Sequence, residues 1–521
     1  MDRVWERCAS IRPMRQAEAS STLDEPRASK LWLGVAWLAC ASLIVLRDTA
    51  LVTSPRFWAE EGIVYFNFAN QHSFAETLGF VHFGYLALFA NIAVGLAAMV
   101  PAATAPLVTL IASAAGQLFV AGFVLFHQGT FLRSTAARIC AVAVVTFVGM
   151  GGELWLNTIN TSHHFPIVVF LVAISDKANL SRGRTAFALG IVVFLGLSSV
   201  VACLVTPLFL LRYLRERQGM DLVLGGALGL VGLVQLGLMA SYSAPLVTRF
   251  GATDETLGRF FYYLFTYPVL PISGEAPLRL WAGLLTVPLM LVLGRKRENQ
   301  LFILGFLICT IAPFLGSIHM IGGVRYAYGA VVIFHLLMLR AALDSGSSKL
   351  LRSACGAALA IAMVTGAACY KSGWSSYSSP QWTTWASEVE AWEAAPRSWV
   401  QVHPQAGGKF GNTWRFKLRP DEIRLAAEHG TAMAVVDERQ VLLPVVHVPT
   451  LGNMRLALRR SEEGVGLWEG QLGEMVSEEE WPMARFSLNL GQLAFVDDQG
   501  EVVHMRVASI SEDFIVQVVG P

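Results

Sequence analysis

The stretch LWLGVAWLACASLIVLRDTALVTSPRFWAEEGIVYF, residues 31 to 66, joins a continuous apolar run to a segment in which two adjacent glutamates lie between aromatic residues. The apolar part, 31–46, approaches the roughly 20 residues that a membrane-spanning helix needs. Glu60 and Glu61 follow it closely, in a chain that otherwise contains few charges. The order of these two features predicts a membrane protein that carries paired carboxylates beside the bilayer.

The composition of the whole chain is that of a membrane protein. Hydrophobic residues make up 54% of the 521 positions and charged residues only 15%, whereas soluble domains average about 25% charged residues. Because the formal net charge is only +1, no basic field favours a nucleic-acid partner. The seven cysteines show neither disulfide nor metal-ligand spacing, which favours a role as small apolar side chains.

Acidic residues divide the chain into a membrane part and a polar tail. Residues 31–370 contain 13 of them, and the shorter segment 371–521 contains 20. Beyond 430 the residues alternate between apolar and polar, which indicates strands. The predicted parts are a cytoplasmic N-terminal tail (1–30), a transmembrane domain (31–370), a periplasmic linker with a short Trp-rich helix at 383–394 (371–429) and a small β-rich periplasmic domain (430–521).

The distribution of Lys and Arg decides which apolar runs cross the bilayer. If every run spanned, the basic segment 127–138 would face outward and the segment 151–165 inward, against the positive-inside rule. The conflict disappears if the run 85–100, which has 16 residues with Asn91 inside it, does not span. We therefore predict an all-α polytopic bundle of about eleven membrane-spanning helices, with 85–100 as an interfacial or re-entrant helix of the first outer loop. The N-terminus is then cytoplasmic and the C-terminus periplasmic.

A pair of half-length helices is predicted in the middle of the chain. The stretch RTAFALGIVVFLGLSSVVACLVTPLFLLRYLRER, 184–217, has basic residues at both ends and GLSS in its middle. One tilted helix would place the two basic ends on opposite sides of the bilayer, so a hairpin that turns at Gly196–Ser199 is favoured. Non-helical backbone at this depth requires cover by protein or water, which implies a polar cavity near the outer face.

Three polar groups fall on the outer side of this topology. Each follows or precedes an apolar run, and each contains side chains that bind or transfer protons. Their candidate site residues are Arg56, Trp58, Glu60 and Glu61 in RFWAEEG, Glu153, Asn157, Asn160, His163 and His164 in GELWLNTINTSHHF, and Arg325 and Tyr326 in GGVRYAY.

The residue types in these groups suit proton transfer next to a phosphate. Paired carboxylates at a low-dielectric boundary tend to have one pKa raised, so that one of Glu60 and Glu61 accepts a proton from a hydroxyl near neutral pH. The planar fork of Arg325 matches a phosphate. Structural alternatives stay open: the glutamate pair as solvated surface, Glu153 as a loop charge and Arg325 as an interfacial anchor.

The adjacent histidines point to loop or substrate contacts. Neighbours on a regular element point apart, which favours such contacts for His163 and His164 over a shared metal ion. No other ligand set is recognisable in the sequence, so a divalent cation is neither assigned nor excluded.

Three motifs, PRFWAEEG, GELWLNTINTSHHF and GGVRY, resemble three blocks of a bacterial subgroup of the GT-C superfamily of membrane glycosyltransferases, over residues 31 to about 415. The resemblance implies a GT-C-like bundle with interfacial helices in the first outer loop, and inverting transfer of a sugar from a polyprenyl phosphate. The subgroup pattern is Arg-Phe-Trp-Ala-Glu-Asp-Gly, from which Glu61 departs, and a Trp commonly stands at the position of His164. The resemblance favours Glu60 as the base and Arg325 as the ligand of the leaving phosphate, with a histidine as a further candidate.

The expected partners follow from this resemblance: membrane lipid, a polyprenyl-phosphate-linked sugar and a glycan or lipid acceptor, at the bacterial inner membrane. Two other functions stay open, a transporter or flippase and a polymerase or ligase of lipid-linked saccharides. Transporters often show internal repeats and midplane charges, which the sequence lacks. The substitutions Glu60→Gln and Glu61→Gln keep the side-chain shape, so both variants are expected to fold.

Overall fold

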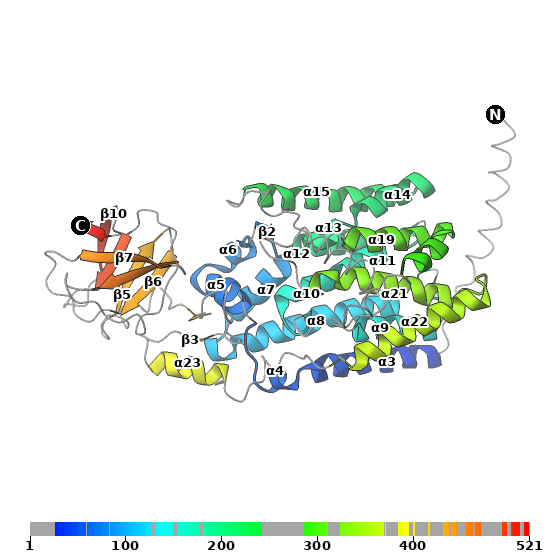
Figure 1. The fold of residues 1–521 in the computed structure, drawn as a ribbon, viewed down its shortest axis with the longest axis horizontal. Helices are drawn as coiled ribbons and strands as arrows, with labels where there is room; N and C mark the ends of the chain where they lie inside the picture. The colour runs from blue at the N-terminus through cyan, green and yellow to red at the C-terminus, as the bar shows by residue number, and fades with distance from the viewer. Residues whose placement is uncertain are drawn as a thin grey trace.

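The computed structural model describes residues 27–241, 286–310, 324–370 and 384–394, together with strands beyond residue 400. Short gaps fall at 59, 83, 128, 130, 149–153, 178–180 and 369. Over the described residues the structure is mostly helical. The long helices lie side by side along one common direction (Figure 1).

The helices are separated by short connections. Those of the first part are α3 (Arg27–Arg47), α4 (Thr49–Thr53), the π-helix η1 (Glu61–Phe66), α5 (Asn67–Gln71), α6 (Phe74–Leu78), α7 (Leu88–Ala97), η2 (Ala102–Thr104), α8 (Ala105–Phe126), α9 (Thr135–Phe147), α10 (Thr158–Thr161), η4 (Ser162–His164) and α11 (Phe165–Ile174). The later ones are α12 (Arg182–Ser198), α13 (Val200–Cys203), α14 (Thr206–Glu216), α15 (Gly219–Ser241), η6 (Arg297–Asn299), α19 (Gln300–Thr310), η7 (Val324–Ala327), α21 (Tyr328–Leu343), α22 (Lys349–Ala368) and α23 (Trp385–Ala394).

Among the helices that the structure describes, five are long and apolar enough to cross a membrane. α21 is mostly buried among the other helices, whereas α3, α15 and α22 expose many apolar side chains. An exposed apolar surface of this extent requires lipid around it, as in an all-α membrane protein. The predicted count of eleven spans stays a prediction. The candidate spans are Ser29–Arg47, Ala102–Phe126, Gly219–Ser241, Arg325–Leu343 and Lys349–Ala368.

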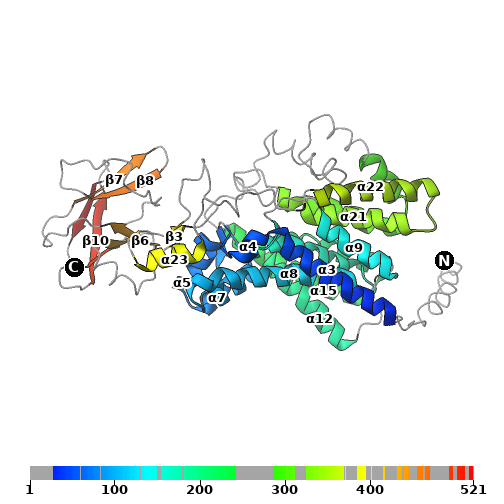
Figure 2. The ribbon, with the colours of Figure 1, turned by 90° about the horizontal axis from the view of Figure 1, so that it is seen from below.

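The segment between α3 and α8 folds at one end of the bundle, as Figures 1 and 2 show for α4, α5 and α7. α7 has ten residues, about 15 Å, which is half the thickness of a bilayer core. This length agrees with a non-spanning segment, but the prediction of one helix over 85–100 is wrong at its start. Tyr85–Leu86 pairs as a strand (β2) with Val81–His82 (β1), and Gly84, with φ 76°, makes the tight turn between them.

The predicted break between two half-length helices is present. α12 ends at Ser198 and α14 begins at Thr206, with only the four-residue α13 between them. The buried Gln235 of α15 covers this break, because its Nε2 lies 3.2 Å from the carbonyl oxygen of Gly196. The same amide bonds the backbone N–H and C=O of Leu86 at 2.9 and 3.0 Å. Protein atoms therefore satisfy the irregular backbone at this depth.

Charged side chains gather at the end of the bundle where α14 meets α19. The buried Lys177 lies 2.6 Å from Asp221, and Arg212 lies 3.6 Å from the other oxygen of the same carboxylate. Burial of these charges is stable only because they are paired. Two basic residues that the positive-inside rule would assign to the cytoplasm thus share one carboxylate. Further ion pairs join Lys296 to Asp344 and Arg340 to Glu298.

The tail contains one helix and short strands. The helix predicted at 383–394 is α23. Two strands, β3 (Val400–Gln401) and β4 (Arg415–Phe416), pair with each other. The others form an antiparallel sheet in the order β6-β5-β9-β10-β11-β7-β8. A periplasmic domain over 430–521 stays a prediction. The strands are β5 (Thr431–Val436), β6 (Arg439–Pro444), β7 (Arg455–Ser461), β8 (Gly464–Glu469), β9 (Gln492–Val496), β10 (Val502–Ile510) and β11 (Ile515–Val519).

Reporter fusions test which helices cross the bilayer. A reporter fused after residue 102 is expected to report the periplasm and one fused after residue 130 the cytoplasm, because α8 is a candidate span between these positions and α7 is too short to span. Paired alkaline phosphatase and green fluorescent protein fusions measure this, since the first is active only outside and the second fluoresces only inside. The reverse result at both positions would show that α7 spans and that the predicted site residues do not share one side.

Candidate functional site

The two glutamates lie at the start of a π-helix. η1 begins at Glu61, and Glu60 precedes it with helical backbone angles. A π-helix closes its hydrogen bonds over five residues, and adjacent side chains on such a turn point in different directions. Glu60 is half-buried and acts on Tyr65, whereas Glu61 is 1% exposed. Turns of this kind are frequent at functional sites.

The carboxylate of Glu61 is held by donors from three segments. Its Oε1 accepts hydrogen bonds from the backbone N–H of Thr158 at 2.8 Å and from the Thr158 hydroxyl. Its Oε2 accepts from the backbone N–H of Trp58 at 3.2 Å and lies 3.4 Å from the Thr109 hydroxyl of α8. Burial raises the pKa of Glu61, and these hydrogen bonds lower it in part. The carboxyl group therefore joins the start of η1 to α8 and to the loop before α10, and both of its oxygens already have donors.

The loop before α10 is fixed by polar side chains. Asn157 is the N-cap of α10, because its Oδ1 accepts from the backbone N–H of Asn160 at 2.9 Å. Leu156 has φ 58°, a left-handed conformation that costs about 1–2 kcal/mol for a residue with a Cβ. Gln117 of α8 holds this turn, since its amide lies 3.4 Å from the Leu156 N–H and 3.3 Å from the Leu154 carbonyl oxygen. Both asparagines are buried, so they are placed to support the loop rather than to meet a ligand.

Two tyrosines lie beside Glu60. Tyr65 is buried and Tyr85 is half-buried. Burial raises the pKa of both phenols, and the charge of Glu60 raises it further. Both hydroxyls therefore keep their protons at neutral pH and are available as hydrogen-bond donors. The Tyr65 ring packs edge-on against His82, 5.5 Å away, on the strand that pairs with Tyr85.

Arg325 and Tyr326 approach the same tyrosines from η7. The Arg325 guanidinium lies 5.3 Å from the ring of Tyr326, and the His163 ring packs on Tyr326 at 4.8 Å. Tyr326 and Glu60 raise the pKa of Tyr85, and Arg325 lowers it. Burial, followed by the charge of Arg325, lowers the pKa of His163 well below its usual value. His163 is therefore neutral, and Arg325 is the cation of this group.

His164 points into the core instead. Its ring is fully buried, 4.9 Å from Trp155 and 4.4 Å from Tyr328. Arg47, at the end of α3, lies 4.1 Å above the Trp155 ring. The two adjacent histidines thus point apart, as predicted, and only His163 lies with the cluster around Arg325.

The residues that precede the two glutamates in RFWAEEG pack against the surrounding helices. Trp58 packs in the main core and gives its backbone N–H to Glu61. Arg56 is largely buried and lies within the electrostatic influence of Glu388 on α23. Phe57 packs between η1 and α23. These residues therefore support the turn that carries the two glutamates.

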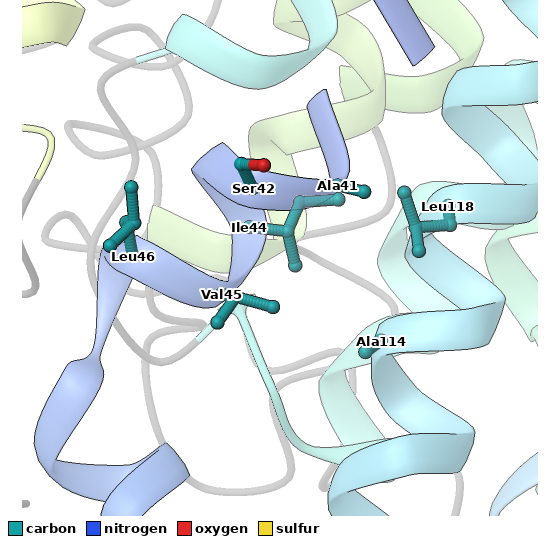
Figure 3. A pocket seen from close by; sticks show the side chains of 7 residues that line it. All are labelled: Ala41, Ser42, Ile44, Val45, Leu46, Ala114 and Leu118. Atoms are coloured by element: carbon teal, nitrogen blue, oxygen red, sulfur yellow. The ribbon is translucent and has the colours of Figure 1, made fainter. Parts of the chain in front are cut away.

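An apolar groove runs between α3 and α8 (Figure 3). Its volume is about 440 Å³. It lies on the part of α3 that leads toward the paired glutamates, and its walls are almost entirely hydrocarbon. The groove has the chemistry of a site for a lipid chain. Its lining residues are Ala41, Ser42, Ile44, Val45, Leu46, Ala114 and Leu118.

The structure brings together only part of the predicted site. Glu60, Arg325, Tyr326 and His163 share one cluster. Glu153 lies outside the described residues. In the part of the chain that the structure describes, no three His, Cys, Asp or Glu side chains are close enough to hold a metal ion. The predicted residues that lie in the surrounding framework are Arg56, Trp58, Glu61, Asn157, Asn160 and His164.

Several residues of the site and its support were not predicted. The apolar pattern predicts a helix over Tyr85, although HFG immediately before it contains the glycine of a tight turn. Thr109, Ser113 and Gln117 recur every four residues on α8, which is the spacing of one polar stripe on an otherwise apolar helix. Such a stripe inside a membrane helix is a signal for a buried polar contact.

No family model matches the chain, and neither a curated protein nor a solved structure matches it.

The sequence predicts that Glu61→Gln leaves folding unchanged. The hydrogen bonds that Glu61 accepts from Trp58 and Thr158 revise this expectation. Glu61→Gln places an NH2 group against backbone N–H donors and is expected to destabilise the protein by about 2 kcal/mol. Thermal unfolding of the purified protein in detergent measures this. Glu60→Gln is the matched control, because it makes the same change at the neighbouring, half-buried position. Equal unfolding temperatures for the two variants would contradict the anchoring role.

Proposed function

We propose that the chain is an inverting glycosyltransferase that moves a sugar from a polyprenyl phosphate to an envelope glycan or lipid, on the outer face of the bacterial inner membrane. The proposal includes eleven spans, a cytoplasmic N-terminus, a periplasmic C-terminus and a β-rich periplasmic domain over 430–521. Its support is the chemistry of the cluster around Glu60 and the resemblance of the three motifs to the GT-C superfamily.

The observation that carries the proposal is a cluster of charged and polar side chains at the end of an apolar bundle, in which the Arg325 guanidinium lies 5.3 Å from the Tyr326 ring and His163 packs on the same ring at 4.8 Å. Burial and the charge of Glu60 raise the pKa of Tyr85 in this cluster, and Arg325 lowers it. A general base and a fixed cation at a membrane edge are the two groups that transfer from a lipid phosphate requires. Because donors already surround both oxygens of Glu61, the base is Glu60.

The reaction would proceed in one displacement. The acceptor hydroxyl gives its proton to the Glu60 carboxylate, and its oxygen attacks the anomeric carbon of the donor. The bond between that carbon and the phosphate oxygen breaks, and its electron pair leaves with the polyprenyl phosphate. Arg325 stabilises the negative charge that develops on this phosphate. Attack from the side opposite the leaving group inverts the configuration of the sugar.

The neutral donors of the cluster would orient the substrates. Tyr65 and Tyr85 keep their protons and can bond sugar or phosphate oxygens. His163 is neutral and adds a hydrogen-bonding group without a second charge. A divalent cation stays outside the proposal, which needs only the charge of Arg325 at the phosphate.

The groove between α3 and α8 supports a lipid-linked substrate. It is apolar, it lies between two candidate spans and it leads toward the segment that carries Glu60. A flippase would move such a substrate without breaking the sugar–phosphate bond, and a polymerase or ligase would transfer an oligosaccharide. The product of the reaction therefore separates the three functions.

The role of Glu60 as the general base is tested by the substitution Glu60→Gln. Glu60→Gln is expected to lower the release of free polyprenyl phosphate by roughly 10²–10⁴-fold, the usual contribution of a general base. The assay uses proteoliposomes, a panel of short-chain polyprenyl-phosphate hexoses and pentoses, and an envelope glycan extract as acceptor. The donors that accumulate in a deletion strain select the panel.

Glu76→Gln is the control for this experiment. It removes an exposed carboxylate from the same outer segment, so it is expected to keep the native rate. Native release by Glu60→Gln would show that the carboxylate is not the base. Release of an oligosaccharide-bearing product, or movement of the donor without cleavage, would favour the other two functions.

The guanidinium at position 325 is tested with lysine. Arg325→Lys keeps the charge but loses the planar fork, so kcat/KM for the donor is expected to fall by about 10-fold with little change in folding. Arg340→Lys, whose side chain pairs with Glu298, is the control for an Arg-to-Lys change away from the cluster. Full activity of Arg325→Lys would reduce Arg325 to a point charge or an interfacial anchor.

A further inference from the structure

The tail helix α23 packs on the segment that carries the paired glutamates. Trp385 is 3% exposed and Val389, one helical turn later, is 1% exposed. The Trp385 ring meets Phe57 edge-on at 5.1 Å, and its Nε1 donates a hydrogen bond to the carbonyl oxygen of Ala102 at 2.8 Å. A buried indole with its N–H satisfied is a firm attachment rather than a chance contact. Figures 1 and 2 both place α23 beside this end of the bundle.

A second part of the tail reaches the π-helix. β3 contacts α23 and pairs with β4, and β4 contacts η1. On α23 itself, Glu388 lies within the electrostatic influence of Arg56, the residue before Phe57. The tail therefore touches the turn both before and after Glu60.

The contacts of Phe57 extend this attachment to the whole turn. Phe57 stacks on Phe66 at a centroid distance of 4.3 Å, and Phe66 is the last residue of η1. Trp385 closes the other side of Phe57. The turn that carries Glu60 is thus held at both ends by one aromatic stack, and the outer member of that stack belongs to the tail.

We propose that α23 is a positioning element of the transfer site and that Trp385 is its positioning residue. The helix holds Phe57, and Phe57 with Phe66 fixes the turn on which the Glu60 carboxylate is presented. This inference rests on the proposed function. Because a displacement of about 1 Å at a reacting group can lower the rate by 10²-fold, loss of this support lowers turnover without removing any reacting group.

Docking of the helix is tested without reference to activity. In the full-length chain with its seven cysteines replaced by alanine, Val389→Cys is expected to resist a membrane-impermeant maleimide and Glu390→Cys to react, because position 389 is buried and position 390 is exposed. Adding Trp385→Ala is expected to make Cys at position 389 react at least 10-fold faster. Rapid labelling of Val389→Cys in the otherwise native tail would overturn the proposal.

Positioning is tested by kinetics in the proteoliposome assay. Trp385→Ala is expected to lower kcat by about 10- to 100-fold while the donor KM changes less than about 2-fold, since the donor ligands are untouched. Trp385→Phe keeps an aromatic ring against Phe57 and is expected to recover most of the rate. Glu390→Gln, on the exposed face of the same helix, is the matched control and is expected to keep the native kcat.

The two measurements separate the inference from the proposed function. If Trp385→Ala releases position 389 but keeps the native kcat, the helix is docked without positioning the site, and the proposal is wrong. If Trp385→Ala and Trp385→Phe raise KM and lower kcat alike, with a lower unfolding temperature, the helix only stabilises the fold, which also overturns it. If the native protein transfers no sugar while Val389→Cys is protected, the proposed function fails and the positioning role fails with it, and the docking of α23 stands.

Discussion

The structure around the candidate site depends on the burial of one carboxylate. Removing an ionised group from water is costly unless hydrogen bonds replace the water, and Glu61 obtains them only when Trp58, Thr109 and Thr158 are all in place. Two of the donors are backbone N–H groups, which can only donate, so they offset part of the burial that raises the pKa of Glu61. The carboxyl group therefore requires the start of η1, α8 and the loop before α10 to assemble together, and it fixes their relative positions.

The same requirement for satisfied polar groups explains the other buried amides. Irregular backbone within a bundle must find partners in the protein, because lipid offers none. Gln117 bonds the strained turn at Leu156, and Gln235 bonds the end of α12 together with the strand at Leu86. Each glutamine provides the hydrogen bonds that water would otherwise supply, and it joins elements that are distant in sequence. The cluster around Glu60 thus lies on a rigid framework, although many of its segments are not helical.

The sequence predicts much of the fold but only part of the site. The composition and the positions of the charged residues are enough to predict a helical membrane protein. The basic residues at both ends of 184–217 are enough to predict the helix break near Ser198. The sequence cannot tell which glutamate of a pair is buried, because that depends on the π-turn and on donors far along the chain. The apolar residues around Tyr85 predict a helix, whereas Tyr85 lies in a hairpin. Asn157 has the residue type of a ligand, but its side chain caps a helix.

Glu60 and Glu61 are neighbours in the chain, but their side chains have different surroundings and therefore different physical roles. At Glu61 the donors are already supplied by the fold, so its carboxyl group holds three segments together. Glu60 precedes it in the chain and obtains a fixed position from this neighbour. Around it, burial keeps Tyr65, Tyr85 and His163 neutral, whereas a guanidinium stays charged in such surroundings because its intrinsic pKa is so high. Among the described residues at this end of the bundle, a carboxylate (Glu60) and a guanidinium (Arg325) thus lie close enough to Tyr85 to act on the same phenol.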